Sequence, residues 1–352
     1  MTITPDEQAN APVISVSGLR KRFNLEAGFF ARLGRYVHAV NGISLDIGRN
    51  ETYGLVGESG CGKTTTARLL VRMYEADEGE ISFRGRDGKV EDVRSLKGRD
   101  FKRYRERVKY IFQDPARSLN PRMTVYEVLT SGARWSMTKR GSAEKARLRE
   151  EAAAVLEEVG LSAADMERRP AEFSGGQRQR ISIARGLLMK PDLLICDEVV
   201  SALDVSVQGQ ILNLLLDLRS SREFSQRELS FLFIAHDLKV ACYFCDRIGV
   251  MYRGEIMEEA PAAEIWKNGL HPYTELLFSS VAGGTSVPGE VEKRGVAAGK
   301  TVTEMEEACA FVSRCKDAES RCFKEKPELR TVGERHLVRC WRDYPPAMSE
   351  KF

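Results

Sequence analysis

The sequence predicts an α/β fold in which helices cover a mainly parallel sheet, and three observations carry this prediction. From about residue 13 to residue 281, short apolar runs alternate with segments of helical periodicity. Two of these runs, at 193–196 and 231–235, are almost continuously apolar, as expected for strands that are buried on both faces. A glycine-rich turn at 57–62 follows a further apolar run and precedes a helical segment.

Apolar patterning also places the individual elements. Strands are expected at 52–56, 109–113, 193–196 and 229–235. A helix is expected over 144–159, because apolar residues recur there at helical spacing and Gly160 follows them. Further helices are expected over 181–189 and 207–218.

Composition and charge narrow the class of protein. The chain has 352 residues, and 54 basic against 51 acidic side chains leave a net charge of +3, which argues against binding to nucleic acid through bulk positive charge. No apolar run approaches the roughly 18 to 20 residues that a membrane-spanning helix needs. Residues 1–11 lack the basic start and apolar core of a signal peptide. A cytosolic protein is therefore expected.

The glycine-rich turn has the spacing of a phosphate-binding loop, G-x-x-x-x-G-K-[ST], and the strand before it and helix after it provide the required context. Its glycines allow backbone N–H groups to surround a β-phosphate, and the helix adds its positive N-terminal end. Lys63 is expected to reach the β- and γ-phosphates, Thr64 to ligate Mg²⁺, and Thr65 to contact the α-phosphate. The loop consists of Gly57, Glu58, Ser59, Gly60, Cys61, Gly62, Lys63 and Thr64.

Two carboxylates end the apolar run at 193–196, which is where a phosphate-loop protein places acids next to the γ-phosphate. Asp197 is expected to hold Mg²⁺, usually through water. Glu198 is placed one residue further on and is expected to polarise the attacking water.

A second glycine turn, formed by Ser174, Gly175, Gly176 and Gln177, opens the helix expected over 181–189. The free N–H groups at a helix start can bind an anion, so this turn is a second candidate phosphate site. Two such sites far apart in one chain suggest that the second serves a nucleotide held mainly by another subunit.

With these motifs in this order, the sequence resembles the nucleotide-binding subunits of ATP-binding-cassette (ABC) transporters. The resemblance implies a RecA-like core, an antiparallel β subdomain and a helical subdomain at about 116–185. It implies that Gln113 contacts Mg²⁺ and the water, that Asp204 crosses a dimer interface, and that His236 contacts the γ-phosphate. The family usually stacks an aromatic ring on the adenine; Phe23 and Tyr36 are both candidates here, and Phe23 is weakly favoured.

Longer stretches resemble the importer branch for dipeptides, oligopeptides and nickel. They are 57–63, 112–122 and 201–208, together with the segment 271–274, which is similar to the start of the branch's C-terminal extension. The resemblance implies a peripheral subunit at the cytoplasmic face of the inner membrane. Its implied partners are a second homologous ATPase, two transmembrane permeases and a periplasmic or extracellular solute-binding protein.

The chain is expected to divide into an ATPase domain at 1–282, a Gly-rich linker at 283–302 and an extension at 303–352 that holds little aliphatic material. Four thiols in this extension could hold a [4Fe–4S] cluster or Zn²⁺, or remain unligated, and the close pairs typical of zinc sites are missing. The resemblance favours the [4Fe–4S] cluster. The four residues are Cys309, Cys315, Cys322 and Cys340.

The expected function is ATP hydrolysis that powers import of peptides or a related small solute through closure of a dimer of cassettes. Two alternatives are a soluble ABC ATPase acting on ribosomes or DNA, and a regulatory ATPase that senses redox state through its cysteines. The transported solute and the competence of the partner ATPase's site are left open by the sequence.

Overall fold

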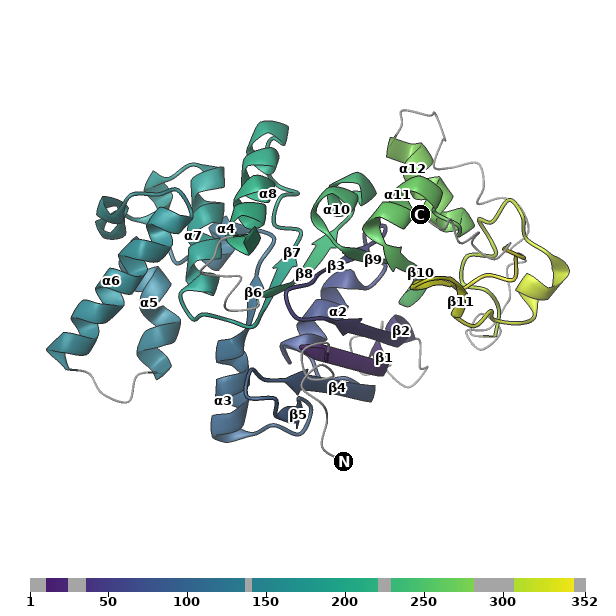
Figure 1. Cartoon of the computed structure of the whole chain (residues 1–352), viewed down its shortest axis with the longest axis horizontal. Coiled ribbons are helices and arrows are strands. Elements are labelled where there is room, and N and C mark those ends of the chain that lie inside the picture. Colours follow the sequence, from purple (N-terminus) through teal and green to yellow (C-terminus); the bar gives the residue numbers. More distant parts are fainter. Residues whose placement is uncertain (1–10, 25–35, 137–140, 221–228, 282–306, 345–352) are drawn as a thin grey trace, which may run out of the picture.

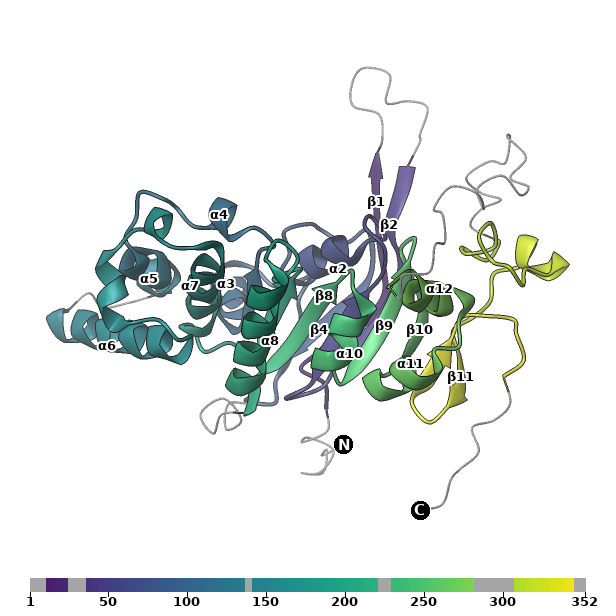
Figure 2. The same ribbon diagram turned by 90° about the horizontal axis from the view of Figure 1, so that it is seen from above.

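The frame of the protein is an eight-stranded sheet, which runs through the centre of the molecule (Figures 1 and 2). The computed structural model describes residues 11–24, 36–136, 141–220, 229–281 and 307–344. The first five strands in order pair in parallel, and the last three pair antiparallel. From one edge to the other they are β6 (Val108–Ile111), β7 (Leu193–Asp197), β8 (Ser230–Ala235), β3 (Thr52–Val56), β9 (Arg247–Tyr252), β10 (Glu255–Pro261), β12 (His336–Val338) and β11 (Arg330–Gly333).

A second, antiparallel sheet of four strands packs beside the first. Ile14 in its β1 strand pairs with Ile47 on one side and with Phe83 on the other, and all three side chains are buried. The strands in order are β2 (Tyr36–Ile47), β1 (Ile14–Asn24), β4 (Glu78–Arg84) and β5 (Val90–Asp92).

Four of the described helices form a group at one edge of the main sheet. This group lies beyond the β6 edge and consists of α4 (Pro115–Ser118), α5 (Val125–Ser136), α6 (Ser142–Glu158) and α7 (Gly175–Leu187); the C-terminal strands lie at the opposite edge (Figure 1). The others are α2 (Lys63–Leu70), α3 (Gly98–Arg107), α8 (Val205–Ser220), α10 (Leu238–Phe244), α11 (Ala262–Asn268) and α12 (Pro272–Val281). Within the described ranges, no helix has both the length and the apolar character needed to cross a membrane.

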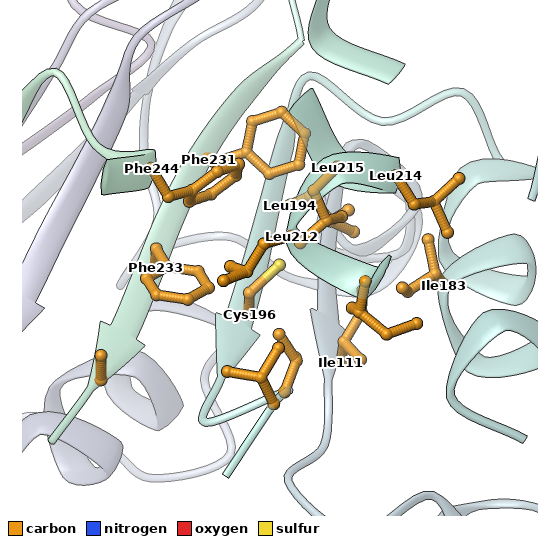
Figure 3. Close-up of a cluster of buried hydrophobic side chains, with 14 of the residues drawn as sticks. Ile111, Ile183, Leu194, Cys196, Leu212, Leu214, Leu215, Phe231, Phe233 and Phe244 are labelled. Carbon is orange, nitrogen blue, oxygen red and sulfur yellow. The ribbon is translucent and has the colours of Figure 1, made fainter. Parts of the chain in front are cut away.

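The core between the main sheet and its helices is aromatic and aliphatic (Figure 3). Phe233 on β8 packs against Phe244 of α10, with ring centroids 4.8 Å apart. Cys196 on β7 is fully buried in the same cluster as an apolar residue, and burial raises the pKa of its thiol well above its ordinary value. The burial of strands β7 and β8 on both faces explains why their sequences are continuously apolar.

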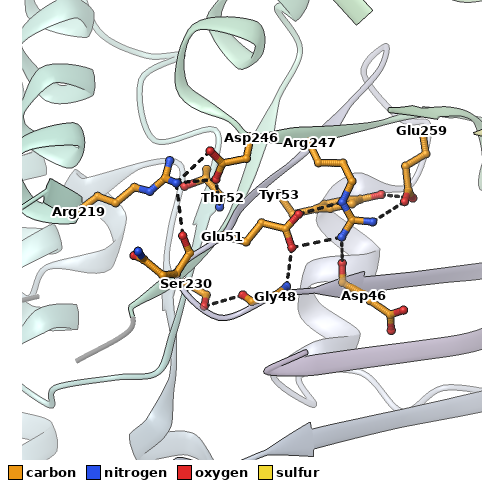
Figure 4. Close-up of polar contacts among 11 residues, drawn as sticks. Asp46, Gly48, Glu51, Thr52, Tyr53, Arg219, Ser230, Asp246, Arg247 and Glu259 are labelled. Carbon is orange, nitrogen blue, oxygen red and sulfur yellow. Dashed lines mark hydrogen bonds and ion pairs between the residues drawn. The ribbon is translucent and has the colours of Figure 1, made fainter. Parts of the chain in front are cut away.

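A polar network holds the start of β3, the strand that leads into the glycine-rich turn (Figure 4). Arg247 on β9 donates to Glu51 at 2.8 Å and to Glu259 at 2.7 Å, and the Tyr53 hydroxyl donates to Glu259 at 2.7 Å. The Thr52 N–H donates to Asp246 at 2.8 Å. These charge-assisted bonds across three strands orient β3 and therefore the loop that follows it.

The elements predicted from apolar patterning agree closely with the structure. The strand at 52–56 is β3, and the strand expected at 109–113 is β6, which starts at Val108 and ends at Ile111. The helix expected over 144–159 is α6, and Gly160 follows it with a φ of 72°, a left-handed conformation that ends helices. The helix expected over 207–218 lies inside α8.

The C-terminal segment differs from a free-standing unit. Its strands β11 and β12 extend the main sheet through the pairing of β12 with β10. Fully buried Glu258 on β10 lies 2.7 Å from Nε2 of His336 and also accepts the N–H groups of Leu270 and His271. The segment has too few apolar residues for a core of its own, and these contacts with the main sheet help to stabilise it. The predicted linker at 283–302 and the N-terminal segment 1–10 lie outside the described residues.

Candidate functional site

The glycine-rich turn connects β3 to α2 and leaves a row of N–H groups at the start of the helix. Gly62 precedes α2 with a φ of 112°, and a Cβ atom placed on it would lie 2.0 Å from the carbonyl oxygen of Ala39. Only glycine fits such a position without displacing backbone. The turn can therefore bring its backbone close to a phosphate, as its spacing predicts.

Lys63 extends along the inside of this turn. Its side chain is buried, and Nζ donates to the carbonyl oxygens of Gly57 at 2.6 Å and Glu58 at 2.9 Å. An ammonium group held within the loop's concavity is placed to pair with the charge of a bound polyphosphate.

The residues expected to hold Mg²⁺ meet where α2 lies beside the end of β7. The Thr64 hydroxyl donates to Oδ1 of Asp197 at 2.9 Å, although the two residues are 133 positions apart. The Tyr110 hydroxyl of β6 donates to the other carboxylate oxygen, Oδ2. Burial, followed by the nearby Asp197 charge, raises the pKa of Tyr110 well above its ordinary value, so this hydroxyl acts as a donor. A threonine hydroxyl beside an oriented carboxylate is the oxygen pair that phosphate-loop proteins use for Mg²⁺.

Glu198 stands at the next position with two of the predicted polar side chains around it. Nε2 of Gln113 donates to Oε2 of Glu198 at 2.7 Å, and Nδ1 of His236 lies 4.0 Å from the same oxygen. Glu198 has a φ of 48°, an uncommon conformation for a residue other than glycine. Such conformations persist where the surroundings hold them, often at active sites. The structure thus brings together Gln113, Glu198 and His236 from three strand ends.

The comparisons with known proteins agree with this geometry. The ABC transporter family model matches residues 40–201, and the model of the C-terminal region of oligopeptide/dipeptide transporters matches 257–322. A putative peptide import ATP-binding protein of Brucella ovis is 41% identical over 94% of this chain and 98% of its own. The chain belongs to the ABC transporter family of ATP-binding proteins. The oligopeptide transport ATP-binding protein AppF of Bacillus subtilis is 39% identical over 93% of this chain and 96% of its own.

The solved structures support the ABC ATPase fold. The ATP-binding cassette MJ0796, solved as a dimer in a post-hydrolysis state with ADP and Pi, superposes with a TM-score of 0.58 at 24% identity, covering 71% of this chain and 98% of that chain. Together with the family match, this fold identifies the protein as an ABC-type ATPase. The alternative of a soluble ABC ATPase for ribosomes or DNA is not favoured, because the match at 257–322 is to a transporter-specific region.

The second glycine turn of this ABC ATPase lies at the start of α7 and forms a capping box. Ser174 Oγ accepts the N–H of Gln177 at 3.3 Å, and Gln177 Oε1 accepts the N–H of Ser174 at 3.0 Å. A Cβ atom on Gly176 would lie 2.6 Å from Val207 of α8, so this turn packs beside the segment that contains Asp204. Among the described residues, no hydrogen bond joins 174–177 to the loop at 57–65 of the same chain.

The two candidate aromatic residues for adenine lie close together at the end of the small sheet. Phe23 is half-buried and contacts Tyr74 edge to face, with centroids 5.3 Å apart. Tyr36 is 40% exposed, and the Arg22 guanidinium lies 5.1 Å from its ring centre. The Lys21 ammonium also lies 5.6 Å from the Phe23 ring centre. The choice between the two rings stays a prediction.

Two residues at the site were missed by the sequence analysis, Tyr110 and Tyr273. Tyr273 Oη accepts the N–H of Glu58 at 2.9 Å, which ties α12 to the phosphate loop. Tyr110 could have been suspected from its place one residue before the buried end of β6. Nothing in the sequence joins Tyr273 to a loop 215 positions earlier.

The four C-terminal cysteines line one small cavity of about 30 Å³. Burial raises the pKa of the Cys309 thiol to about 12, and the neighbouring thiols of Cys322, Cys340 and Cys315 act in the same direction. In the part of the chain that the structure describes, no three His, Cys, Asp or Glu side chains stand in a single-ion arrangement. The four thiols therefore share one cavity.

Proposed function

We propose that this ATPase powers the import of peptides, or of a related small solute, through an ABC transporter. The observation that carries the proposal is the match to peptide-import relatives over nearly the whole chain. The contacts Thr64–Asp197 and Gln113–Glu198, between residues expected to serve Mg²⁺ and the attacking water, support it.

The mechanism follows from the separation of the two glycine turns. Two cassettes would face each other, so that ATP on the loop 57–65 of one chain is covered by Ser174–Gln177 of the other. Lys63 would balance charge on the β- and γ-phosphates, and Thr64 and Asp197 would hold Mg²⁺. Glu198, oriented by Gln113, would accept a hydrogen bond from the attacking water, and His236 would contact the γ-phosphate. Asp204 would lie at the interface between the two cassettes.

The partners and the place of action follow from the transporter role. The second cassette would be a homologous ATPase, working beneath two permeases that a solute-binding protein supplies, at the cytoplasmic face of the inner membrane. We also propose residues 1–282 as the ATPase domain, with a helical subdomain at about 116–185, residues 283–302 as a linker and residues 303–352 as the extension.

An uptake experiment tests the proposed solute. A strain that lacks this chain is supplied with the wild-type gene or with Glu198→Gln, and uptake of a radiolabelled oligopeptide is compared with uptake of nickel and of a glycoside. Peptide uptake should return with the wild-type gene alone. Restoration of nickel or glycoside uptake with no change in peptide uptake would contradict the assignment.

We further propose that the cysteine cavity holds a [4Fe–4S] cluster. Four thiolates are the usual ligand set of such a cluster. Cys309, Cys315, Cys322 and Cys340 line one cavity, and the close sequence pairs typical of zinc sites are missing. When bound, the cluster would supply a cross-link that holds this segment and a group able to exchange one electron. The four thiolates would hold it, and Phe311 and Pro327 also line this cavity.

Anaerobic purification followed by iron, sulfide and zinc analysis tests the cluster. About four irons and four sulfides per chain, with broad absorption near 400 nm, are expected for a [4Fe–4S] site. The variant Cys309→Ser should lose iron, whereas Cys196→Ser, which changes a thiol in the sheet core, should retain it. Stoichiometric zinc without iron would overturn the proposal, and so would a metal-free protein.

A further inference from the structure

The C-terminal segment reaches directly into the phosphate loop through one ion pair. Arg314 donates from Nη1 to Oε2 of Glu58 at 2.7 Å and from Nη2 to Oε1 at 2.8 Å. The two residues are 256 positions apart, and Glu58 is the second residue of the loop. The two parallel bonds match the fork of the guanidinium to both carboxylate oxygens, which is the strongest geometry for such a pair.

Arg314 is held in place by the docked C-terminal segment. Its guanidinium carbon lies 5.7 Å from the ring centre of Tyr252 and 5.8 Å from that of Phe311. Phe311 is buried against Tyr252 and Tyr273, with centroids 5.3 Å apart in both cases. The turn is closed by the N–H groups of Arg314 and Cys315, which donate to the Phe311 carbonyl oxygen. The position of the guanidinium therefore depends on the same turn that presents Cys315 to the cavity.

Glu58 places a negative charge at the edge of the loop that is expected to bind a polyphosphate. Its N–H donates to Tyr273, its carbonyl oxygen accepts from Lys63 at 2.9 Å, and its carboxylate lies at the edge of the loop with 42% exposure. An unpaired carboxylate at this position would repel a bound polyphosphate, since like charges within a few ångströms oppose each other. Arg314 neutralises that charge, and its two hydrogen bonds hold the Glu58 carboxylate in one orientation.

We propose that Arg314 is a positioning residue of the nucleotide site, through which the docked C-terminal segment raises nucleotide affinity by neutralising and orienting Glu58. This deepens the ATP-binding role of the loop and does not depend on which solute is transported. Because both partners are partly exposed, at 30% and 42%, solvent weakens the effect. Loss of the pair should weaken nucleotide binding about three- to tenfold.

Calorimetric titration of the full-length protein with MgADP tests the proposal without interference from hydrolysis. Arg314→Gln should raise Kd about three- to tenfold, and Arg314→Lys, which retains the charge but not the fork, should fall between this variant and the wild type. In steady-state assays with MgATP, Arg314→Gln should raise KM with little change in kcat, since the pair acts on binding. The matched control is Lys316→Gln, two residues after Arg314. This variant breaks the exposed ion pair between Lys316 and Glu275 and should leave Kd within twofold.

The double variant Arg314→Gln/Glu58→Gln distinguishes neutralisation of the Glu58 charge from a purely structural contact between the C-terminal segment and the loop. If Arg314 acts by neutralising Glu58, removing the carboxylate should recover at least threefold of the affinity lost in Arg314→Gln. The same Kd for the double variant and Arg314→Gln would overturn the proposal, and so would wild-type affinity in Arg314→Gln. Circular dichroism and thiol counting on each variant establish that the chain is folded, and the wild-type titration separately establishes that the loop binds nucleotide.

Discussion

Gln113 and Glu198 are joined by a 2.7 Å hydrogen bond between Nε2 of the amide and Oε2 of the carboxylate. The amide follows β6 and precedes α4, so it belongs to the start of the helical segment, whereas the carboxylate follows β7. A movement of the helical segment relative to the sheet would therefore change the orientation of the proposed catalytic carboxylate directly.

Replacing this carboxylate by its amide should separate hydrolysis from binding. Glu198→Gln keeps the shape of the side chain but cannot act as a base, so steady-state ATP turnover should fall at least about 100-fold. The affinity for MgATP, measured by equilibrium dialysis, should stay within about threefold of wild type. Asp217→Asn, an exposed acid on α8, serves as the control with unchanged turnover. Turnover above a tenth of wild type in Glu198→Gln would rule out the assigned role.

Tyr110 should affect the magnesium requirement more than the nucleotide affinity. Its hydroxyl donates to Oδ2 of Asp197, the carboxylate whose other oxygen accepts from Thr64. Tyr110→Phe removes this orienting bond, and the half-saturating Mg²⁺ concentration for ATPase activity should rise about tenfold. Tyr243→Phe, which changes an exposed hydroxyl at 62% exposure, should leave the Mg²⁺ titration unaltered. Equal titrations for both variants would mean that Asp197 does not depend on Tyr110.

Gly62→Ala should abolish nucleotide binding while most of the fold persists. The added Cβ atom would lie 2.0 Å from the Ala39 carbonyl oxygen at a φ of 112°, so the loop must shift to accommodate it. Binding of MgADP by calorimetry should become undetectable at micromolar protein. Gly209→Ala, on the exposed face of α8 with open space around it, should bind normally and stabilise the protein by up to about 1 kcal/mol. Normal MgADP binding by Gly62→Ala would refute this account of the loop.

His271 should make the protein less stable in acid. Burial lowers its pKa from 6.5 to about 4, against a smaller opposing effect of Glu258. Between pH 6.5 and 4 the unfolded chain binds the proton and the folded chain does not, so stability falls as the pH falls through this window. From pH 8 to pH 5 the loss should be about 2 kcal/mol.

The variant His271→Asn tests how much of this pH dependence of stability comes from His271. His271 Nδ1 accepts the N–H of Tyr273 at 3.0 Å, a helix-capping role that asparagine can also perform. Thermal melts of His271→Asn should therefore show a shallower loss of Tm between pH 7 and pH 5 than melts of the wild type. Parallel pH profiles for the two proteins would show that His271 does not titrate as the structure indicates.

Much of the nucleotide site could be predicted because its signals are local. The spacing of Gly57, Gly62 and Lys63 specifies a turn between a strand and a helix. Asp197 is the last residue of a buried strand, and Glu198 follows it directly. In parallel sheets the carboxyl ends of neighbouring strands meet at one edge, which is why these distant segments converge. Tyr110 was missed because its role depends on which strand lies beside β7.

The sequence by itself determined the local signals: the spacing of a phosphate-binding loop, two acids at the end of an apolar strand, and four thiols in a segment with little apolar content. Tertiary structure alone decided where that segment docks. The pairing of β12 with β10, the buried Glu258–His336 contact and the Arg314–Glu58 pair join residues that are tens to hundreds of positions apart. Such contacts leave no periodicity or local spacing in the sequence, because they depend on how the folded sheet brings its edges and loops together.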